Sequence, residues 1–186
     1  MDSTTLYRLS GYASLIASLA YLSDTALDFL LPGNPFGVGI LVSLFALFGL
    51  NGIFLKHREQ GGWFDLIAYL VNHLGLTALV GIVFVNNFIF PVLQPDVVKS
   101  IMSGPALGLF IAIGTTYLVG AILFGLSVWL RKVFSRPAAL LYMAGSIPVA
   151  LPPLFPENIV SLGGVLIAIA LMWWGYELTR QLDRIP

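Results

Sequence analysis

Residues 106–130 read ALGLFIAIGTTYLVGAILFGLSVWL, a stretch without a charged side chain. An α-helix rises about 1.5 Å per residue, so a helix that crosses roughly 30 Å of bilayer hydrocarbon needs about 20 mostly apolar residues. Four further segments meet this requirement, at residues 9–31, 36–55, 63–93 and 159–178. The sequence therefore predicts an all-α fold, a polytopic membrane helical bundle.

The composition of the whole chain also indicates a membrane protein. Of its 186 residues, 58% are hydrophobic and 10% are charged, whereas an average soluble domain is about 25% charged. The net charge is zero, which argues against a nucleic-acid partner, and the lack of cysteine excludes disulfides and thiolate metal sites. We expect residues 1–186 to form a single transmembrane domain whose main partner is the lipid bilayer.

A sixth segment, residues 138–155, is apolar but rich in proline. Pro148 and Pro152 lie within it, and Pro156 follows it. Proline lacks a backbone N–H and crowds the preceding turn of a helix. We therefore predict that this fifth helix of the bundle crosses the membrane with a kink between residues 144 and 148.

The distribution of basic residues predicts the topology, because lysine and arginine accumulate in cytoplasmic loops. Six transmembrane helices with both the N- and C-termini cytoplasmic leave only Lys99 on the outer side. The other eight basic residues are then cytoplasmic: Arg8, Lys56, Arg58, Arg131, Lys132, Arg136, Arg180 and Arg184. Without the fifth crossing, Arg180 and Arg184 would lie outside. In the longest outer loop, residues 91–105, we expect a short interfacial helix, with a plain connecting loop as the alternative.

Small residues at four-residue spacing favour close helix packing, because lipid tails are as apolar as leucine and helices in a membrane associate where their backbones can approach. Two such stripes are present. They comprise Ser10, Ser14 and Ser18 in the first span, and Gly104, Gly108, Ala112, Thr116 and Gly120 in and before the fourth.

The third span carries the most informative polar residues. Asp65, Tyr69, His73 and Thr77 follow each other at intervals of four and are expected to share one helix face. His73 lies ~15 Å along the helix from Trp63, near the bilayer centre. A polar group at that depth must face protein or a wet cavity.

Several roles for this stripe remain open. His73 can be a histidine whose hydrogen bonds are satisfied by a neighbouring helix, or an axial ligand of chlorophyll or haem. It can also relay protons with Asp65, or contact a polar substrate. A haem held by two histidines is not expected, because His57 is placed in the basic inner loop.

The opening residues 6–13, LYRLSGYA, lead into a first helix rich in small residues. This segment resembles the start of small uncharacterised bacterial multi-spanning proteins of the DUF4386 kind. The resemblance covers about the first 25 residues and implies a helical bundle in the cell inner membrane. It carries no established activity.

Three functions are compatible with these features, and the first is preferred. It is a non-catalytic scaffold or accessory subunit, not an enzyme, that contacts other membrane subunits through its helix faces. The second is a small transporter or channel lined by the Asp65, Tyr69, His73 and Thr77 stripe and gated at the fifth span. The third is a chlorophyll- or haem-binding subunit of a photosynthetic or respiratory complex, with His73 as axial ligand.

Overall fold

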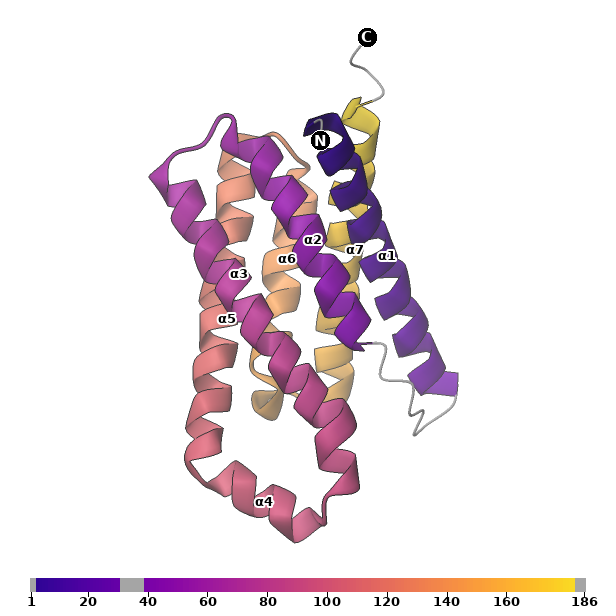
Figure 1. The fold of residues 1–186 in the computed structure, drawn as a ribbon, viewed down its shortest axis with the longest axis vertical. Coiled ribbons are helices and arrows are strands. Elements are labelled where there is room, and N and C mark those ends of the chain that lie inside the picture. Colours follow the sequence, from indigo (N-terminus) through magenta and orange to yellow (C-terminus); the bar gives the residue numbers. More distant parts are fainter. Residues whose placement is uncertain (1–2, 31–38, 183–186) are drawn as a thin grey trace.

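The computed structural model describes residues 3–30 and 39–182, and every regular element in these ranges is helical (Figure 1). The long helices are α1 Ser3–Leu30, α2 Gly39–Arg58, α3 Trp63–Phe84, α5 Pro105–Arg131, α6 Arg136–Ala150 and α7 Glu157–Leu182. The short ones are the π-helical turn η1 Val85–Ile89, the 3₁₀ turns η2 Phe90–Val92 and η3 Pro152–Leu154, and α4 Pro95–Ser103. The predicted all-α class is confirmed for the described residues.

The long helices form a closed ring. Each packs against the next along the chain, and α7 returns to pack against α1. Successive long helices run in opposite directions, so the start of α1 and the end of α7 lie at the same end of the bundle (Figure 1). We call this end, which also holds the α2–α3 and α5–α6 turns, the basic end.

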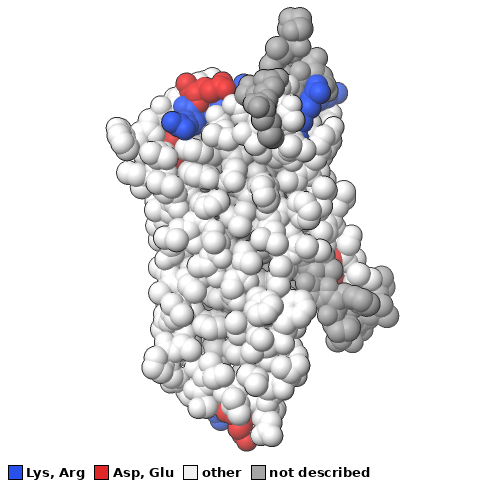
Figure 2. All heavy atoms as spheres, in the orientation of Figure 1, with Lys and Arg blue, Asp and Glu red and all other residues white. Residues whose placement is uncertain are grey.

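Charged side chains gather at the two ends of the bundle, and the face drawn in Figure 2 is otherwise uncharged apart from an acidic atom beside the undescribed segment. In the described ranges, four helices are long and apolar enough to cross a membrane: α2, α3 with its extension to Val92, α5 and α7. The chain is therefore compatible with an integral membrane protein. Helix α6 has 15 residues and spans about 22 Å, and neither it nor α1 is among the four.

The prolines of the fifth segment end its helix. Pro148 lies inside α6, and the helix stops at Ala150, two residues later. Pro152 then opens the turn η3. The kink expected between residues 144 and 148 stays a prediction.

A short helix occupies the segment 91–105, as expected. Helix α4 starts at Pro95 and lies across the end of the bundle opposite the basic end, between α3 and α5 (Figure 1). None of its residues is buried. Its prediction as a helix is confirmed, and its contact with a membrane surface stays a prediction.

The serine stripe of α1 packs as expected. Ser10, Ser14 and Ser18 are all buried. A Cβ atom on Gly49 of α2 would collide with Ser14, and one on Gly52 would collide with Ser10. Small residues thus lie where the α1 and α2 backbones approach each other.

The stripe of α5 packs differently from the prediction. Gly120 lies against the backbone of Asn72, and Thr116 is half-buried. Gly108 and Ala112 are exposed, and no atom of the described residues lies within 4 Å of a Cβ position on Gly108. Gly104 lies between α4 and α5. Four residues turn a helix by about 400°, so a stripe at this spacing drifts about 40° per step around the helix. The stripe is therefore not a single packing face within this chain.

Candidate functional site

A buried polar cluster joins three helices at the basic end. His57 lies in the last turn of α2, Asp65 in the first turn of α3, and Ser127 and Arg131 one turn apart near the end of α5. His57, Asp65 and Ser127 are 0% exposed. We call these four residues the polar cluster.

Both oxygens of the Asp65 carboxylate accept hydrogen bonds. Arg131 donates from Nη2 to Oδ2 at 2.6 Å and from Nε to both oxygens at 3.0 and 3.2 Å. Ser127 Oγ donates to Oδ1 at 2.6 Å, and the backbone N–H of Gly62, which precedes α3, donates to Oδ2 at 2.6 Å. A buried carboxylate is tolerated when a cation and several hydrogen bonds replace its water. The same carboxylate therefore caps α3 and ties it to α5.

His57 extends the cluster to α2. Its Nδ1 lies 3.0 Å from the Ile53 carbonyl oxygen, and its Nε2 lies 3.0 Å from Ser127 Oγ. The carbonyl only accepts, and Ser127 gives its one hydrogen to Asp65, so both ring nitrogens must donate to complete all the bonds. A ring with a single proton donates only one of these two bonds, and its tautomer decides which one.

The order of these groups is not that of a hydrolytic triad. In such a triad the histidine lies between the serine and the carboxylate and removes the serine proton. Here Ser127 lies between His57 and Asp65, and its hydrogen points to the carboxylate. Ser127 is held as a bridge, so the cluster connects helices and does not present a nucleophile.

The four residues of the stripe predicted on α3 lie in different surroundings. Asp65 enters the polar cluster, while Tyr69 stacks on Phe54 with ring centroids 4.0 Å apart and donates to Asn51 Oδ1 at 2.7 Å. His73 is half-buried with its ring 5.3 Å from that of Tyr69. Thr77 is exposed and donates to the His73 carbonyl of its own helix. The expectation of one common polar face is wrong for Thr77, because the four-residue spacing drifts around the helix.

His57 does not lie in the basic inner loop, where the sequence predicts it. It is fully buried in α2 between the rings of Phe54 and Phe124. The sequence does indicate the pairing of Asp65 with Arg131. Asp65 lies at the start of the third predicted span and Arg131 follows the end of the fourth, so the two side chains are expected at the same end of the bundle, close enough to pair.

A second buried polar group lies farther from the basic end. Tyr142 of α6 donates to Asn72 Oδ1 at 3.2 Å, and Tyr117 of α5 lies 3.2 Å from Ser146 Oγ. The Asn72 Nδ2 atom has no hydrogen-bond partner among the described residues. These contacts connect α3, α5 and α6 by interhelical hydrogen bonds, which help helices to associate in a membrane.

A cavity of about 150 Å³ lies among the helices. Its lining is mostly apolar and includes Ala17, Val42, Leu79 and Ile167. Asp65, Tyr69, His73 and Thr77 do not line it. The volume is below the 300–1,000 Å³ of usual small-molecule sites, and within the described residues no three side chains of His, Asp or Glu gather as metal ligands.

Comparison with known proteins adds no relative. No protein-family model, curated protein or solved structure matches the chain. The resemblance of residues 6–13 to proteins of the DUF4386 kind stays a prediction.

Proposed function

We propose that this chain is a non-catalytic, multi-pass subunit of the bacterial inner membrane that acts as a scaffold or accessory component of a larger complex. Six helices cross the bilayer, with the basic end in the cytoplasm. The observation that carries the partner role is a pair of glycines, Gly81 of α3 and Gly108 of α5, that have no packing neighbour among the described residues.

The ring and its charges support the proposed topology. Helices α1 and α6 alternate in direction with the four apolar helices, so we infer that they cross the membrane as well. The described basic residues at the basic end are Arg8, Lys56, Arg58, Arg131, Lys132, Arg136 and Arg180, and Lys99 lies on α4 at the opposite end. Arg184 lies outside the described residues. Trp63 and Trp173, 80% and 42% exposed, also lie near the basic end, at a level that suits the headgroups.

Glycine inside a helix costs about 0.5–1 kcal/mol relative to alanine, so its presence calls for a packing reason. Most glycines of the described helices have one, because a Cβ would meet a neighbouring helix: Gly11, Gly39, Gly49, Gly52, Gly75, Gly114, Gly120, Gly125, Gly145, Gly163, Gly164 and Gly175. Gly81 and Gly108 face open space. A helix from another chain would supply the missing contact.

The two glycines lie at similar heights. Gly75 packs on Tyr117 and Gly120 packs on Asn72, which fixes the antiparallel register of α3 and α5. In this register Gly81 and Gly108 are about one helical turn apart. The partner that fits is an apolar transmembrane helix, because Gly108 is flanked by the exposed side chains of Leu109 and Ile111, 61% and 55% exposed.

Purification from native membranes in mild detergent tests the role. We expect a partner chain to co-purify with the wild type and with Ala26→Ile, a matched change from small to large on the exposed side of α1. Gly108→Ile should lose that chain, because the added side chain keeps the partner backbone away. A wild-type protein that purifies as a lone monomer, or equal retention by both variants, contradicts the proposal.

The second candidate is a chlorophyll- or haem-binding subunit with His73 as axial ligand. It is favoured by one observation: both ring nitrogens of His57 are hydrogen-bonded, whereas His73 is half-buried and its Nδ1, which is enclosed by the protein, has no hydrogen-bond partner among the described residues. An absorption spectrum of the purified protein decides. Pigment bands that disappear in His73→Leu support this candidate, and their absence from the wild type removes it.

A further inference from the structure

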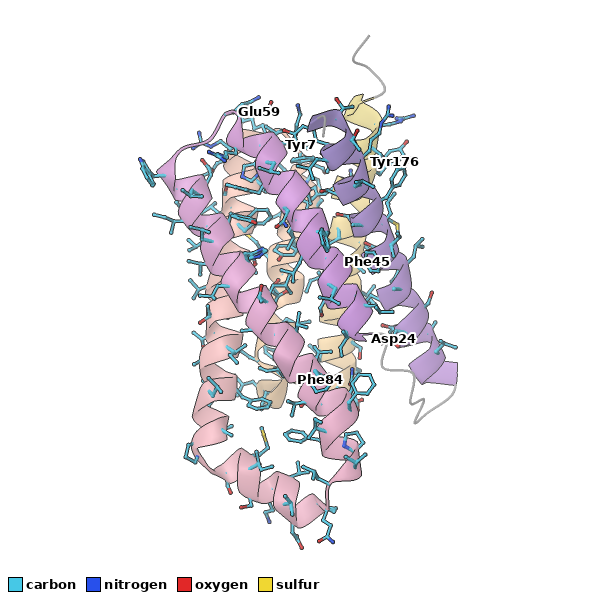
Figure 3. All side chains as sticks on the ribbon, viewed as in Figure 1. Tyr7, Asp24, Phe45, Glu59, Phe84 and Tyr176 are labelled. Atoms are coloured by element: carbon cyan, nitrogen blue, oxygen red, sulfur yellow. The ribbon has the colours of Figure 1, made fainter. Side chains whose placement is uncertain are left out.

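An open pocket lies at the basic end between the α5–α6 turn and the last turns of α7. Its volume is about 470 Å³. Its lining includes six polar or aromatic residues: Lys132, Ser135, Trp173, Tyr176, Glu177 and Arg180. None of them belongs to the polar cluster. Figure 3 shows Tyr176 at this end of α7, on the same end of the bundle as Tyr7 and Glu59.

The pocket carries an excess of positive charge. Lys132 and Arg180 are exposed, and within residues 3–30 and 39–182 neither forms an ion pair with a carboxylate. Glu177, the one acid among the described residues of the lining, accepts the backbone N–H of Ser135 at 2.9 Å and so caps the start of α6. Two cations therefore share a pocket with one carboxylate that is already engaged.

Lys132 occupies a backbone position that normally favours glycine or asparagine. Its φ is 60° and its ψ is 20°, and in the described ranges it is the sole non-glycine residue with a positive φ. Such a conformation is unfavourable for a residue with a Cβ. Arg131 already supplies a cation to the negative end of the α5 dipole, so the dipole alone does not account for a second one here.

The rim of the pocket is aromatic. Trp173 and Tyr176 are 42% and 49% exposed, and the Arg180 guanidinium lies 5.1 Å from the centre of the Tyr176 ring. Tryptophan and tyrosine prefer the headgroup level of a bilayer, where one side of the ring is apolar and the other is wet. In the proposed topology the pocket opens at that level of the cytoplasmic leaflet.

We propose that this pocket binds the headgroup of an anionic phospholipid. Lys132 and Arg180 contact the phosphate, and the faces of Trp173 and Tyr176 lie beside the first carbons of the acyl chains. Basic pockets beside transmembrane helices on the cytoplasmic side suit anionic headgroups, and the aromatic rim favours a phosphate that carries chains over free phosphate. The inference rests on the proposed membrane orientation and not on the partner subunit.

Lipid binding to the purified chain tests this inference. The protein in a zwitterionic detergent is titrated with short-chain phosphatidylglycerol, with short-chain phosphatidylcholine and with inorganic phosphate, and bound ligand is counted by native mass spectrometry. We expect phosphatidylglycerol to bind at least tenfold more tightly than the other two. The Lys132→Asn/Arg180→Gln variant should lose this preference, and asparagine at position 132 tolerates the left-handed backbone, so folding is retained.

The matched control is Lys56→Gln/Arg58→Gln, which removes two positive charges from the same end of the bundle outside the pocket. It should change the affinity less than about twofold. Equal weakening by both double variants would show attraction to surface charge alone and overturn the site. Binding of inorganic phosphate as tight as that of phosphatidylglycerol would overturn the assignment to a lipid. Either result leaves the partner-subunit proposal standing.

Discussion

Asp65 and Arg131 form a pair whose members differ in access to water. The side chain of Asp65 is 1% exposed and that of Arg131 is 34% exposed. Arginine can extend its guanidinium to the headgroup region when its partner is lost, whereas the carboxylate stays enclosed. Replacing Asp65 and replacing Arg131 should therefore have unequal effects on the free energy of unfolding.

Replacing the cation should destabilise the protein more than replacing the carboxylate. Arg131→Met leaves a buried charge without its cation, and we expect a loss of about 3–5 kcal/mol in the free energy of unfolding. Asp65→Asn removes the buried charge itself, so a smaller loss is expected, and the double variant should cost less than the sum of the single ones. Chemical unfolding in detergent measures all three. A larger loss for Asp65→Asn than for Arg131→Met is incompatible with this description.

The bridging hydroxyl can be tested separately. Ser127→Ala removes the contact between His57 and Asp65, and we expect a loss of about 1–3 kcal/mol because two buried polar atoms lose a partner. Ser103→Ala on the exposed helix α4 should change stability by less than about 0.5 kcal/mol. Thermal unfolding of both variants beside the wild type supplies the comparison, and equal effects would show that the bridge contributes nothing.

At this scale the sequence predicted part of the site. Asp65 was singled out because a carboxylate inside a span is costly. His57 was not, because Lys56 and Arg58 flank it and make it look like part of a loop. Its burial depends on the packing of α2 against α5 residues 67 or more positions away, such as Phe124 and Ser127, which periodicity along one helix does not reveal.

Helices α3 and α5 approach each other closely at two glycines. A Cβ on Gly75 would lie 2.5 Å from Tyr117 Cα, and one on Gly120 would collide with the backbone of Asn72. The neighbouring atoms are backbone and cannot turn away. The α3–α5 interface thus depends on the absence of side chains at these two positions.

Alanine substitutions should separate packed from open glycines. Gly75→Ala and Gly120→Ala are expected to destabilise the purified protein by about 1–3 kcal/mol through overpacking. Gly81→Ala and Gly108→Ala should be neutral or should stabilise it by up to about 1 kcal/mol, because alanine favours the helix and meets no atom of residues 3–30 or 39–182. Melting temperatures of the four variants check this, and a loss at Gly108 as large as that at Gly120 would contradict the packing described.

The helices themselves were largely predictable, and their contact faces were only partly so. Apolar length predicted the four strongest spans, and Pro95 with its following valines predicted α4. The serine stripe of α1 lies in the contact between α1 and α2. The α5 stripe does not form one contact face, because a constant step of four residues drifts around a helix, whereas the buried face of α5 alternates steps of three and four at Gly114, Tyr117, Ala121, Phe124 and Val128.

For the whole molecule, the sequence predicted the class and the gathering of charge at helix ends. The closure of the ring through α1 and α7 was not predictable, because it joins the two ends of the chain and depends on shape. The ring brings the basic residues of four separate segments to one end of the bundle, and the proposed orientation in the membrane rests on that gathering. Orientation is therefore the claim on which the depth of the polar cluster and the position of the lipid pocket depend.

Single-cysteine labelling tests this claim directly, because the natural chain contains no cysteine. Arg58→Cys, Lys132→Cys and Lys99→Cys are each exposed to a membrane-impermeant maleimide, in intact spheroplasts and after permeabilisation. We expect Lys99→Cys to react in intact spheroplasts, and Arg58→Cys and Lys132→Cys to react only once the membrane is opened. Reaction of Arg58→Cys and Lys132→Cys from opposite sides of the membrane would contradict the account.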